Sequence, residues 1–401
     1  MEQVFTDKMQ RTGFLNLPSW HKQLKSLLSE YEKGDLLFAP VLNAEDSDQC
    51  WRSLESDDFF ASVDTGIAFH SVSGRLPTNV VTSDSEFAVK LISEKLADRV
   101  GYRAALGAIQ PALDLKYSFP GNFIPGKILA LCDGQANALL LEMEKRFCTL
   151  DEALSEIQWK GLANQTPLKS VHGILLKERI LLLAWHFYRY FPESKNLQTS
   201  GLKAIQPEDM KFVRELGACI RLAGRLEFRN NVLKVRISPV LLHDSHPLAK
   251  TTRNAEGILL ADEKNEHICI GQIEENVSRM NGIIKDLTEI RKGETRKNEA
   301  GTDEEISFSD ENFESKYYLR FSLENFSSTL SQIASAFSHF EIQLERVIQP
   351  RLLPELPEQL IFVTAKTEES LLKKALREID TNVRLAALRS CHEIEGSLDQ
   401  N

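Results

Sequence analysis

Apolar positions between residues 79 and 261 follow helix and strand spacing in turn. Asn79-Val-Val-Thr82 is typical of a short buried strand, and residues 85–99 have helical spacing. Helical spacing also covers residues 127–141, 150–159, 171–187 and 207–222. Strands are predicted at 225–228, 232–240 and 257–261, with Asn230-Asn231 as a turn. This order predicts a mixed α/β region.

The last part of the chain has a separate pattern. We predict strand 317–323, helix 328–339, strands 341–348 and 359–364, helix 367–378, and a strand at 383–388, in the order βαββαβ. Residues 292–315 before it are charged and poor in apolar side chains, which is typical of a solvated linker.

Residues 1–78 are less regular. They contain a helical stretch at 20–33 and a short apolar strand at 35–41. A nucleotide-binding domain normally opens with a strand that runs into a glycine-rich turn. No G-x-G-x-x-G motif is present, and the first thirteen residues contain no apolar strand.

Composition excludes several classes of function. The 401 residues are 42% hydrophobic, enough for two or three domains. A net charge of −10 argues against a nucleic-acid partner. The six cysteines form no C-x-x-C pair, so we expect reduced thiols in a cytoplasmic protein. The first residues are too polar for a signal peptide, and charges interrupt the most apolar window, 174–191, so no membrane partner is expected.

Metal binding is also not expected. His243 and His246 have an i, i+3 spacing but lie in a predicted strand-loop segment. His267 and Cys269 alternate on a strand, and no second pair of ligands accompanies them. A structural role is therefore the better interpretation of all four residues.

Several segments in a shared order resemble one enzyme family. Val80-Val-Thr82, Arg103-Ala-Ala-Leu-Gly107, Asp133-Gly-Gln-Ala-Asn137 and Pro239-Val-Leu-Leu-His-Asp-Ser-His-Pro-Leu-Ala249 are similar to segments of the homoserine dehydrogenases. Tyr317 to Asn325, with Leu330 to Ala334 and Leu344 to Gln349, resembles the ACT domain appended to them. The resemblance covers about 79–271 and 316–395.

The resemblance implies an α/β fold class with three parts. Residues 1–130 are expected to be a degenerate Rossmann-like, nucleotide-binding-like domain. Residues 131–275 are expected to be a central α+β substrate and dimerisation domain, followed by a return helix at 276–291. After the acidic linker at 292–315, residues 316–401 are expected to be the βαββαβ ACT domain.

The family's chemical residues are mostly replaced. Its first lysine, which follows Val-Val-Thr, corresponds to Ser85. Its glutamate corresponds to Asn164, and its aspartates correspond to Thr166, Ser170 and Leu175. Its second lysine corresponds to Arg179, and an arginine stays protonated at any working pH. Simpler roles are open for two of these residues: Ser85 as a helix N-cap or first-turn residue, and Arg179 as the partner of an acidic group.

Cofactor binding is not expected either. The family's later glycine stretch corresponds to Gly271-Gln-Ile-Glu-Glu275, where two carboxylates would repel a phosphate. We therefore expect a catalytically inactive protein, either a homodimer or a regulatory subunit of an active aspartate-pathway enzyme in amino-acid biosynthesis.

Two alternatives remain open. The first is an active homoserine dehydrogenase that uses NADP, or an oxidoreductase for another substrate, with a site rebuilt around Lys90, Lys116 or Lys127. The second is an amino-acid sensor in which Asn325, Ser327 and Ser328 bind an effector. The family usually has Pro-Gly at this turn, so the replacement by Ser327-Ser328 puts effector binding in doubt.

Overall fold

The structure is a computed structural model of the chain. It describes residues 123–160, 167–193, 195, 197–251, 255–272, 306–309, 313–324, 326–350, 358–382, 386–396 and 398, and, before them, 12–15, 65–68, 79–82, 85–93, 101–104, 109 and 112. The chain divides into two compact units. One comprises residues 1–124, 181–191 and 271–303, and the other comprises residues 125–180, 192–270 and 304–401.

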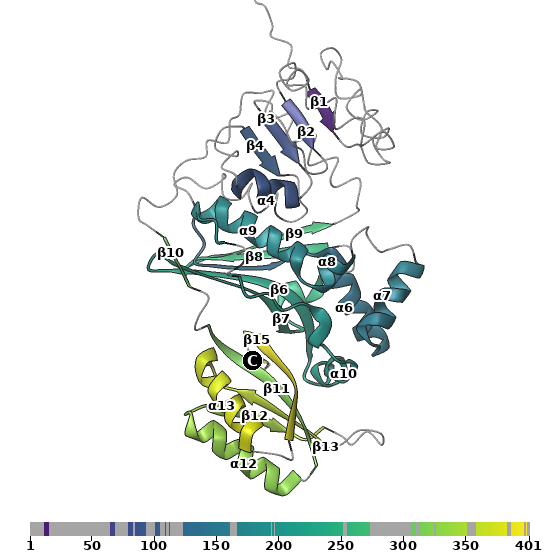
Figure 1. The fold of residues 1–401 in the computed structure, drawn as a ribbon, viewed down its shortest axis with the longest axis vertical. Coiled ribbons are helices and arrows are strands. Elements are labelled where there is room, and N and C mark those ends of the chain that lie inside the picture. Colours follow the sequence, from purple (N-terminus) through teal and green to yellow (C-terminus); the bar gives the residue numbers. More distant parts are fainter. Residues whose placement is uncertain are drawn as a thin grey trace, which may run out of the picture. The chain divides into compact units, whose positions relative to one another are not determined.

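The first unit contains a four-stranded parallel sheet. Its order is β1 (Thr12–Leu15), β2 (Thr65–Ala68), β3 (Asn79–Thr82) and β4 (Gly101–Ala104) (Figure 1). Helix α4 (Ser85–Ser93) follows β3. Strand β3 and the start of α4 confirm the predictions for residues 79–82 and Ser85. The expected helix at 20–33 and strand at 35–41 lie outside the described residues.

The second unit is built on an 11-stranded sheet. Its central strands are β5 (Lys127–Leu131), β6 (Ala218–Arg229), β7 (Val232–His243), β8 (Ala255–Ala261) and β9 (Glu266–Gln272). β6 and β7 form a long hairpin that turns at Asn230 and Asn231, both with left-handed φ (49° and 58°), a backbone that asparagine tolerates well. The predicted turn at these residues is confirmed.

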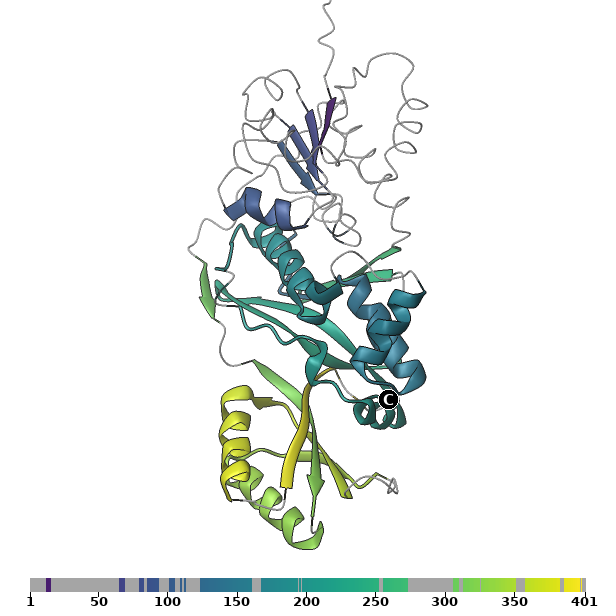
Figure 2. The same ribbon diagram turned by 45° about the vertical axis from the view of Figure 1, so that its right-hand side comes forward.

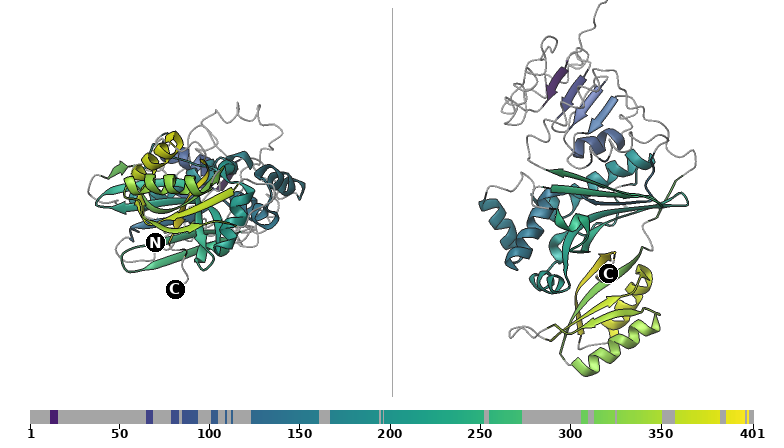
Figure 3. Two further views of the ribbon diagram at one scale, coloured as in Figure 1. Left: turned by 90° about the horizontal axis from the view of Figure 1, so that it is seen from below. Right: turned by 180° about the vertical axis from the view of Figure 1, so that it is seen from behind.

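Helices accompany the central strands. They are α6 (Gly134–Arg146), α7 (Leu150–Trp159), α8 (Pro167–Val171), α9 (Ile174–Tyr188) and α10 (Pro207–Glu215). Figures 1 and 3 show α6, α7 and α10 grouped at one end of the strands. Between β7 and β8, η4 (Pro247–Lys250) packs on the sheet, where Leu248 and Ala249 join the buried core of β5, β6 and β8.

The C-terminal domain has the predicted βαββαβ order. It consists of β11 (Glu314–Leu323), α12 (Phe326–His339), β12 (Leu344–Ile348), β13 (Glu358–Thr364), α13 (Glu369–Asn382) and β15 (Ala386–Glu395). The strand order β12-β13-β11-β15, with antiparallel pairs, is the ferredoxin-like arrangement. Both helices lie on one face of these strands (Figure 2), over a core that includes Phe321, Phe337 and Phe362.

The C-terminal domain continues the central sheet. The end of β15 pairs in parallel with β7, placing Glu393 opposite Val240 and Glu395 opposite Leu242. The short strand β14 (Thr367–Glu368) pairs with β11.

Three predictions need correction. Residues 127–131 form the buried strand β5, so the helix expected at 127–141 begins only at Gly134. The helix expected at 207–222 ends at Glu215, because β6 starts at Ala218. Within the expected linker, β10 (Ser307–Ser309) pairs with β7 and Phe313 is fully buried, so this part is not a solvated tether. The return helix at 276–291 lies outside the described residues.

Candidate functional site

The N-terminus of α6 forms the floor of the candidate site. Asp133 follows β5 and caps the helix by accepting a hydrogen bond from the backbone N–H of Ala136 (2.9 Å). One turn further on, the Asn137 amide donates to the carbonyl oxygens of Leu131 and Ala255, at 3.3 Å each. These bonds tie the start of α6 to β5 and β8, so the side chains here are held rigidly.

Arg179 reaches this floor from α9. Its guanidinium donates to the Glu256 carboxylate on β8 and to the carbonyl oxygen of Cys132. Arg179 is 7% exposed and Glu256 is fully buried. Burial by itself lowers the pKa of Arg179, but the charge and hydrogen bond of Glu256 together with the nearby Cys132 and Asp133 outweigh it, and the net pKa is raised. The guanidinium therefore remains protonated, and the Glu256 carboxylate balances its positive charge.

A glycine allows this close approach of α9 to the sheet. Gly224 of β6 lies directly under Ile180, the residue after Arg179. A Cβ atom at Gly224 would lie 2.2 Å from Ile180 Cδ1, well inside van der Waals contact. The absence of a side chain at residue 224 is thus part of what places Arg179 beside Glu256.

Three polar atoms in the same buried cluster have no hydrogen-bond partner of normal geometry among the described residues. They are Asp133 Oδ2, Asn137 Oδ1 and the Ser170 hydroxyl. All three side chains are at least 98% buried. Burial raises the pKa of Asp133, although the hydrogen bond from the Ala136 N–H, the Arg179 charge and the nearby Ser170 hydroxyl each lower it in part. Buried polar atoms normally have a partner, so these three atoms mark the part of the cluster whose hydrogen bonding is least complete.

The structure brings together only some of the predicted site residues. Ser170 in α8 and Arg179 in α9 belong to the buried cluster, and Leu175 lies half-buried one turn before Arg179. Ser85 begins α4 in the other compact unit and is buried (6% exposed), consistent with a first-turn role. Asn164 lies outside the described residues.

The sequence pattern does not predict Glu256 as a member of the cluster, and it singles out Asp133 only as part of a family-like segment. Glu256 is the single charged residue in an otherwise apolar strand, Ala255–Ala261. A carboxylate in a buried strand needs a cationic partner, and this signal could have identified it. One predicted role for Arg179 is pairing with an acidic group, and in the structure this group is Glu256.

The residues expected to bind an effector are placed differently from the prediction. Ser327 and Ser328 lie in the first turn of α12, which begins at Phe326, so they do not form the turn before the helix. Asn325 lies outside the described residues. Of the four residues weighed as metal ligands, His243 contacts the Ser245 hydroxyl through Nδ1 (2.7 Å), and His246 caps η4 by accepting from the Leu248 N–H.

Comparison with known proteins shows a resemblance to one enzyme family. The family model for homoserine dehydrogenase matches residues 115–288, which contain the whole buried cluster. The homoserine dehydrogenase of Helicobacter pylori is 25% identical over 285 residues, or 70% of this chain and 68% of that protein. Over these residues the chain is similar to the homoserine dehydrogenases.

Solved homoserine dehydrogenases share the fold. The Thiobacillus denitrificans enzyme superimposes with a TM-score of 0.80 at 17% identity, covering 97% of this chain and 99% of that one. A hyperthermophilic archaeal homoserine dehydrogenase, solved in complex with NADPH, has a TM-score of 0.54 at 14% identity and covers 71% of this chain and 98% of that one. None of the helices in the described residues has the length and apolar character needed to cross a bilayer.

The residues that follow β1 do not fit a dinucleotide in the usual way. A nucleotide-binding fold places its glycine-rich turn directly after the first strand, so that the backbone can approach the pyrophosphate. After β1 this chain reads Asn16-Leu-Pro-Ser-Trp20, which contains no glycine. The sequence therefore lacks the phosphate-binding turn at the place where the fold requires it.

Proposed function

We propose that this protein is a non-catalytic member of the homoserine dehydrogenase family that acts by binding. The observation that carries the proposal is the buried Arg179–Glu256 ion pair. Oxidising a hydroxyl group by hydride transfer requires a side chain that accepts the hydroxyl proton. Arg179 occupies the position of a family lysine, but the raised pKa of its guanidinium prevents proton exchange.

Glu256 adds a second obstacle to catalysis. Its carboxylate accepts a hydrogen bond from the Arg179 guanidinium and neutralises the positive charge that would otherwise attract an anionic substrate. A buried ion pair is costly to separate, because each charge would be left without a partner. The missing glycine turn after β1 supports the same conclusion for the cofactor, so the proposed function includes none.

The proposed role is regulatory, within aspartate-family amino-acid metabolism. The chain retains the central sheet and helices of the family fold. These elements support folding and association, and the residues that carry out the family's chemistry are replaced. The proposed partner is a second copy of this chain or an active enzyme of the same metabolism.

An activity assay on the purified full-length chain tests this proposal. The chain is incubated with homoserine and either NAD or NADP, and the absorbance of the reduced cofactor is followed beside an active homoserine dehydrogenase. We expect no reduction above the rate without protein, and no binding of NADPH by fluorescence titration. Turnover that disappears when Ser170 is changed to alanine would contradict the proposal.

The second candidate is an active homoserine dehydrogenase that uses NADP, and the comparisons by themselves favour it. The matched family model and the relatives described above are homoserine dehydrogenases. This candidate needs an amine from outside the family positions. Lys127 is bound to Glu395 at the edge of the C-terminal domain, so Lys90 and Lys116 remain as sources. If activity is found, substitution of these two lysines by methionine distinguishes a rebuilt site from the family site.

A sensor function for the C-terminal domain is a third candidate, supported by its ferredoxin-like topology, which is the arrangement expected of an ACT domain. Calorimetric titration of the full chain with threonine and related amino acids tests it. Heat that saturates at one amino acid per chain would support the sensor, and a flat titration across the series would exclude it.

A further inference from the structure

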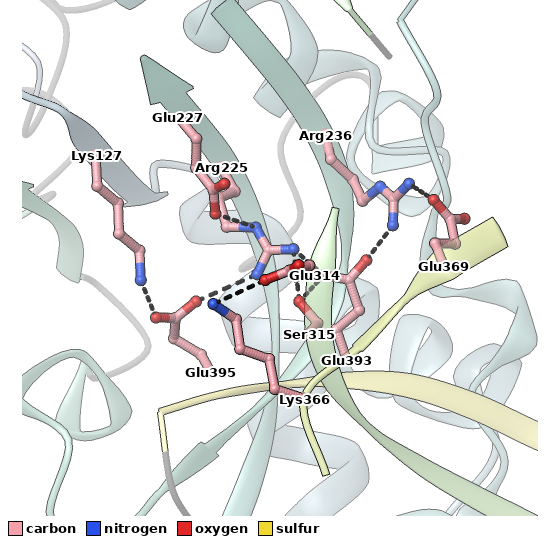
Figure 4. Close-up of polar contacts among 10 residues, drawn as sticks. All are labelled: Lys127, Arg225, Glu227, Arg236, Glu314, Ser315, Lys366, Glu369, Glu393 and Glu395. Atoms are coloured by element: carbon pink, nitrogen blue, oxygen red, sulfur yellow. Dashed lines mark hydrogen bonds and ion pairs between the residues drawn. The ribbon is translucent and has the colours of Figure 1, made fainter. Parts of the chain in front are cut away.

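Two arginines of the central sheet contact carboxylates of the C-terminal domain. Arg225 on β6 donates to Glu393 of β15 and to the Ser315 hydroxyl of β11 (3.0 Å). Arg236 on β7 binds the same Glu393 (2.5 Å) and also Glu369. Figure 4 shows Glu393 between the two guanidinium groups. A single carboxylate therefore joins two central strands to the last strand of the chain.

An aromatic ring fills the space beside these arginines. Phe313, immediately before β11, is fully buried. The guanidinium carbons of Arg225 and Arg236 lie 4.8 and 4.6 Å from its ring centroid, which is within cation–π range. The backbone carbonyl of Phe313 also accepts from the N–H of Glu369 (3.1 Å). The entry of the chain into the C-terminal domain is thus held by the central sheet.

A third arginine, which belongs to the C-terminal domain, contacts residues of the central region. Arg320 of β11 donates to Asp209 (2.7 Å) and Gln206 (2.7 Å), which lie at the start of α10. Ser390 of β15 donates to the same Asp209 carboxylate (2.5 Å). Arg320 is 2% exposed and Asp209 is fully buried. The C-terminal domain therefore holds the first turn of a helix in the central region.

The two connections are reciprocal. Arg236 of the central sheet binds Glu369 in the first turn of α13, and Arg320 of the C-terminal domain binds Asp209 in the first turn of α10. Arg236, Arg320 and Asp209 are buried and Glu369 is half-buried. Removing one partner therefore takes away part of the charge compensation of the other, although Glu393 remains beside Arg236 and Lys373 remains beside Glu369. Neither helix start can move without disturbing a residue of the other domain.

We propose that Arg236–Glu369 and Arg320–Asp209 form a reciprocal arginine clamp. The clamp fixes the first turn of α10 to the C-terminal domain and the first turn of α13 to the central sheet. The clamp makes the two domains respond together to any ligand that displaces one of these helices. This inference is independent of whether the protein oxidises homoserine.

Hydrogen–deuterium exchange of the full chain tests the clamp. Arg320→Gln should speed exchange in the peptide covering α10 by roughly tenfold, although the substitution lies in the C-terminal domain. Arg236→Gln should do the same for α13. The matched controls are Lys316→Gln on β11 and Arg229→Gln at the exposed end of β6, and both should leave the two helices unchanged.

Exchange in β8 separates coupling from a general loss of stability. The clamp predicts that β8 exchange stays close to that of the original protein in both variants. Faster exchange confined to the domain that carries each substitution would overturn the proposal, and so would an equal increase in every peptide. If the glutamine variants do not fold, Arg320→Lys and Arg236→Lys keep the charge while losing the forked contacts, and the same pattern of peptides is expected with a smaller increase.

Discussion

At the scale of single residues, Glu256 determines the character of the candidate site. It is fully buried and its charge is balanced by Arg179. The pair explains why an arginine can occupy this position without an external anion. The same residues show the limit of sequence reasoning: the loss of a lysine at residue 179 was visible, but the charge that neutralises its replacement comes from a strand 77 residues away.

Removing the Glu256 charge should destabilise the protein strongly. Glu256→Gln leaves Arg179 buried without a counter-charge, so we expect the free energy of unfolding to fall by about 3–5 kcal/mol. Urea denaturation at pH 7 measures it, with Glu263→Gln in the exposed β8–β9 turn as the matched control. An unchanged midpoint for Glu256→Gln would show that the ion pair does not contribute to stability.

Replacing both charges should cost far less than replacing one. Arg179→Met combined with Glu256→Leu removes the ion pair and fills the space with apolar atoms. Such double replacements of buried pairs are often neutral or stabilising, so we expect stability within about 2 kcal/mol of the original. Measured beside Glu256→Gln under the same conditions, a double variant less stable than the single one would contradict this account.

At the scale of elements, close packing of α9 on β6 depends on Gly224. In Gly224→Ala the new methyl group would overlap Ile180, so the helix or its side chains must shift, at a cost of about 1–3 kcal/mol. Thermal unfolding followed by circular dichroism measures the loss. Gly126→Ala is the control, because a Cβ there would approach no atom closer than 3.7 Å, and its melting temperature should stay nearly unchanged.

Element types were predictable where one hydrophobic period dominated. The helix at 150–159 and the strands of the β6–β7 hairpin were found in this way. The strand at 127–131 was missed because it is buried on both faces, so its apolar run, Lys127-Ile-Leu-Ala-Leu131, carries no alternation. The helix α10 was extended too far because the break at Gly217 depends on its left-handed φ of 67°, which the apolar pattern does not reveal.

For the candidate site, the sequence predicts only the positions at which this chain differs from the family's residues. The family pattern singles out Ser170 and Arg179, and the structure has both residues in the buried cluster around Asp133. Their buried neighbours were not predicted as members of the site, because a hydrogen bond such as Asn137 to Ala255 joins residues far apart in sequence. Long-range polar pairing leaves no periodic signal, so it becomes visible only when the strands are in register.

At the scale of the whole molecule, the junction between the central region and the C-terminal domain should be sensitive to acid. Burial by itself would raise the pKa of Asp209, but the nearby His392 (4.0 Å) and the hydrogen bond and charge of Arg320 lower it well below its usual range. The pKa of Glu395, which contacts Lys127 and Arg225, is lowered as well.

The direction of the effect follows from linkage. A carboxyl group with a lower pKa in the folded state stabilises the fold fully above its unfolded pKa of about 4, and this contribution is lost as the pH falls. The free energy of unfolding should therefore decline between about pH 5 and pH 2. Asp209→Asn should be less stable at pH 7 and should show a shallower decline, measured by urea denaturation at each pH. Asp380→Asn, at an exposed position on α13, should retain the original slope. If Asp209→Asn declines as steeply as the original protein, then the acid dependence arises elsewhere and the Arg320–Asp209 contact does not hold the domains together.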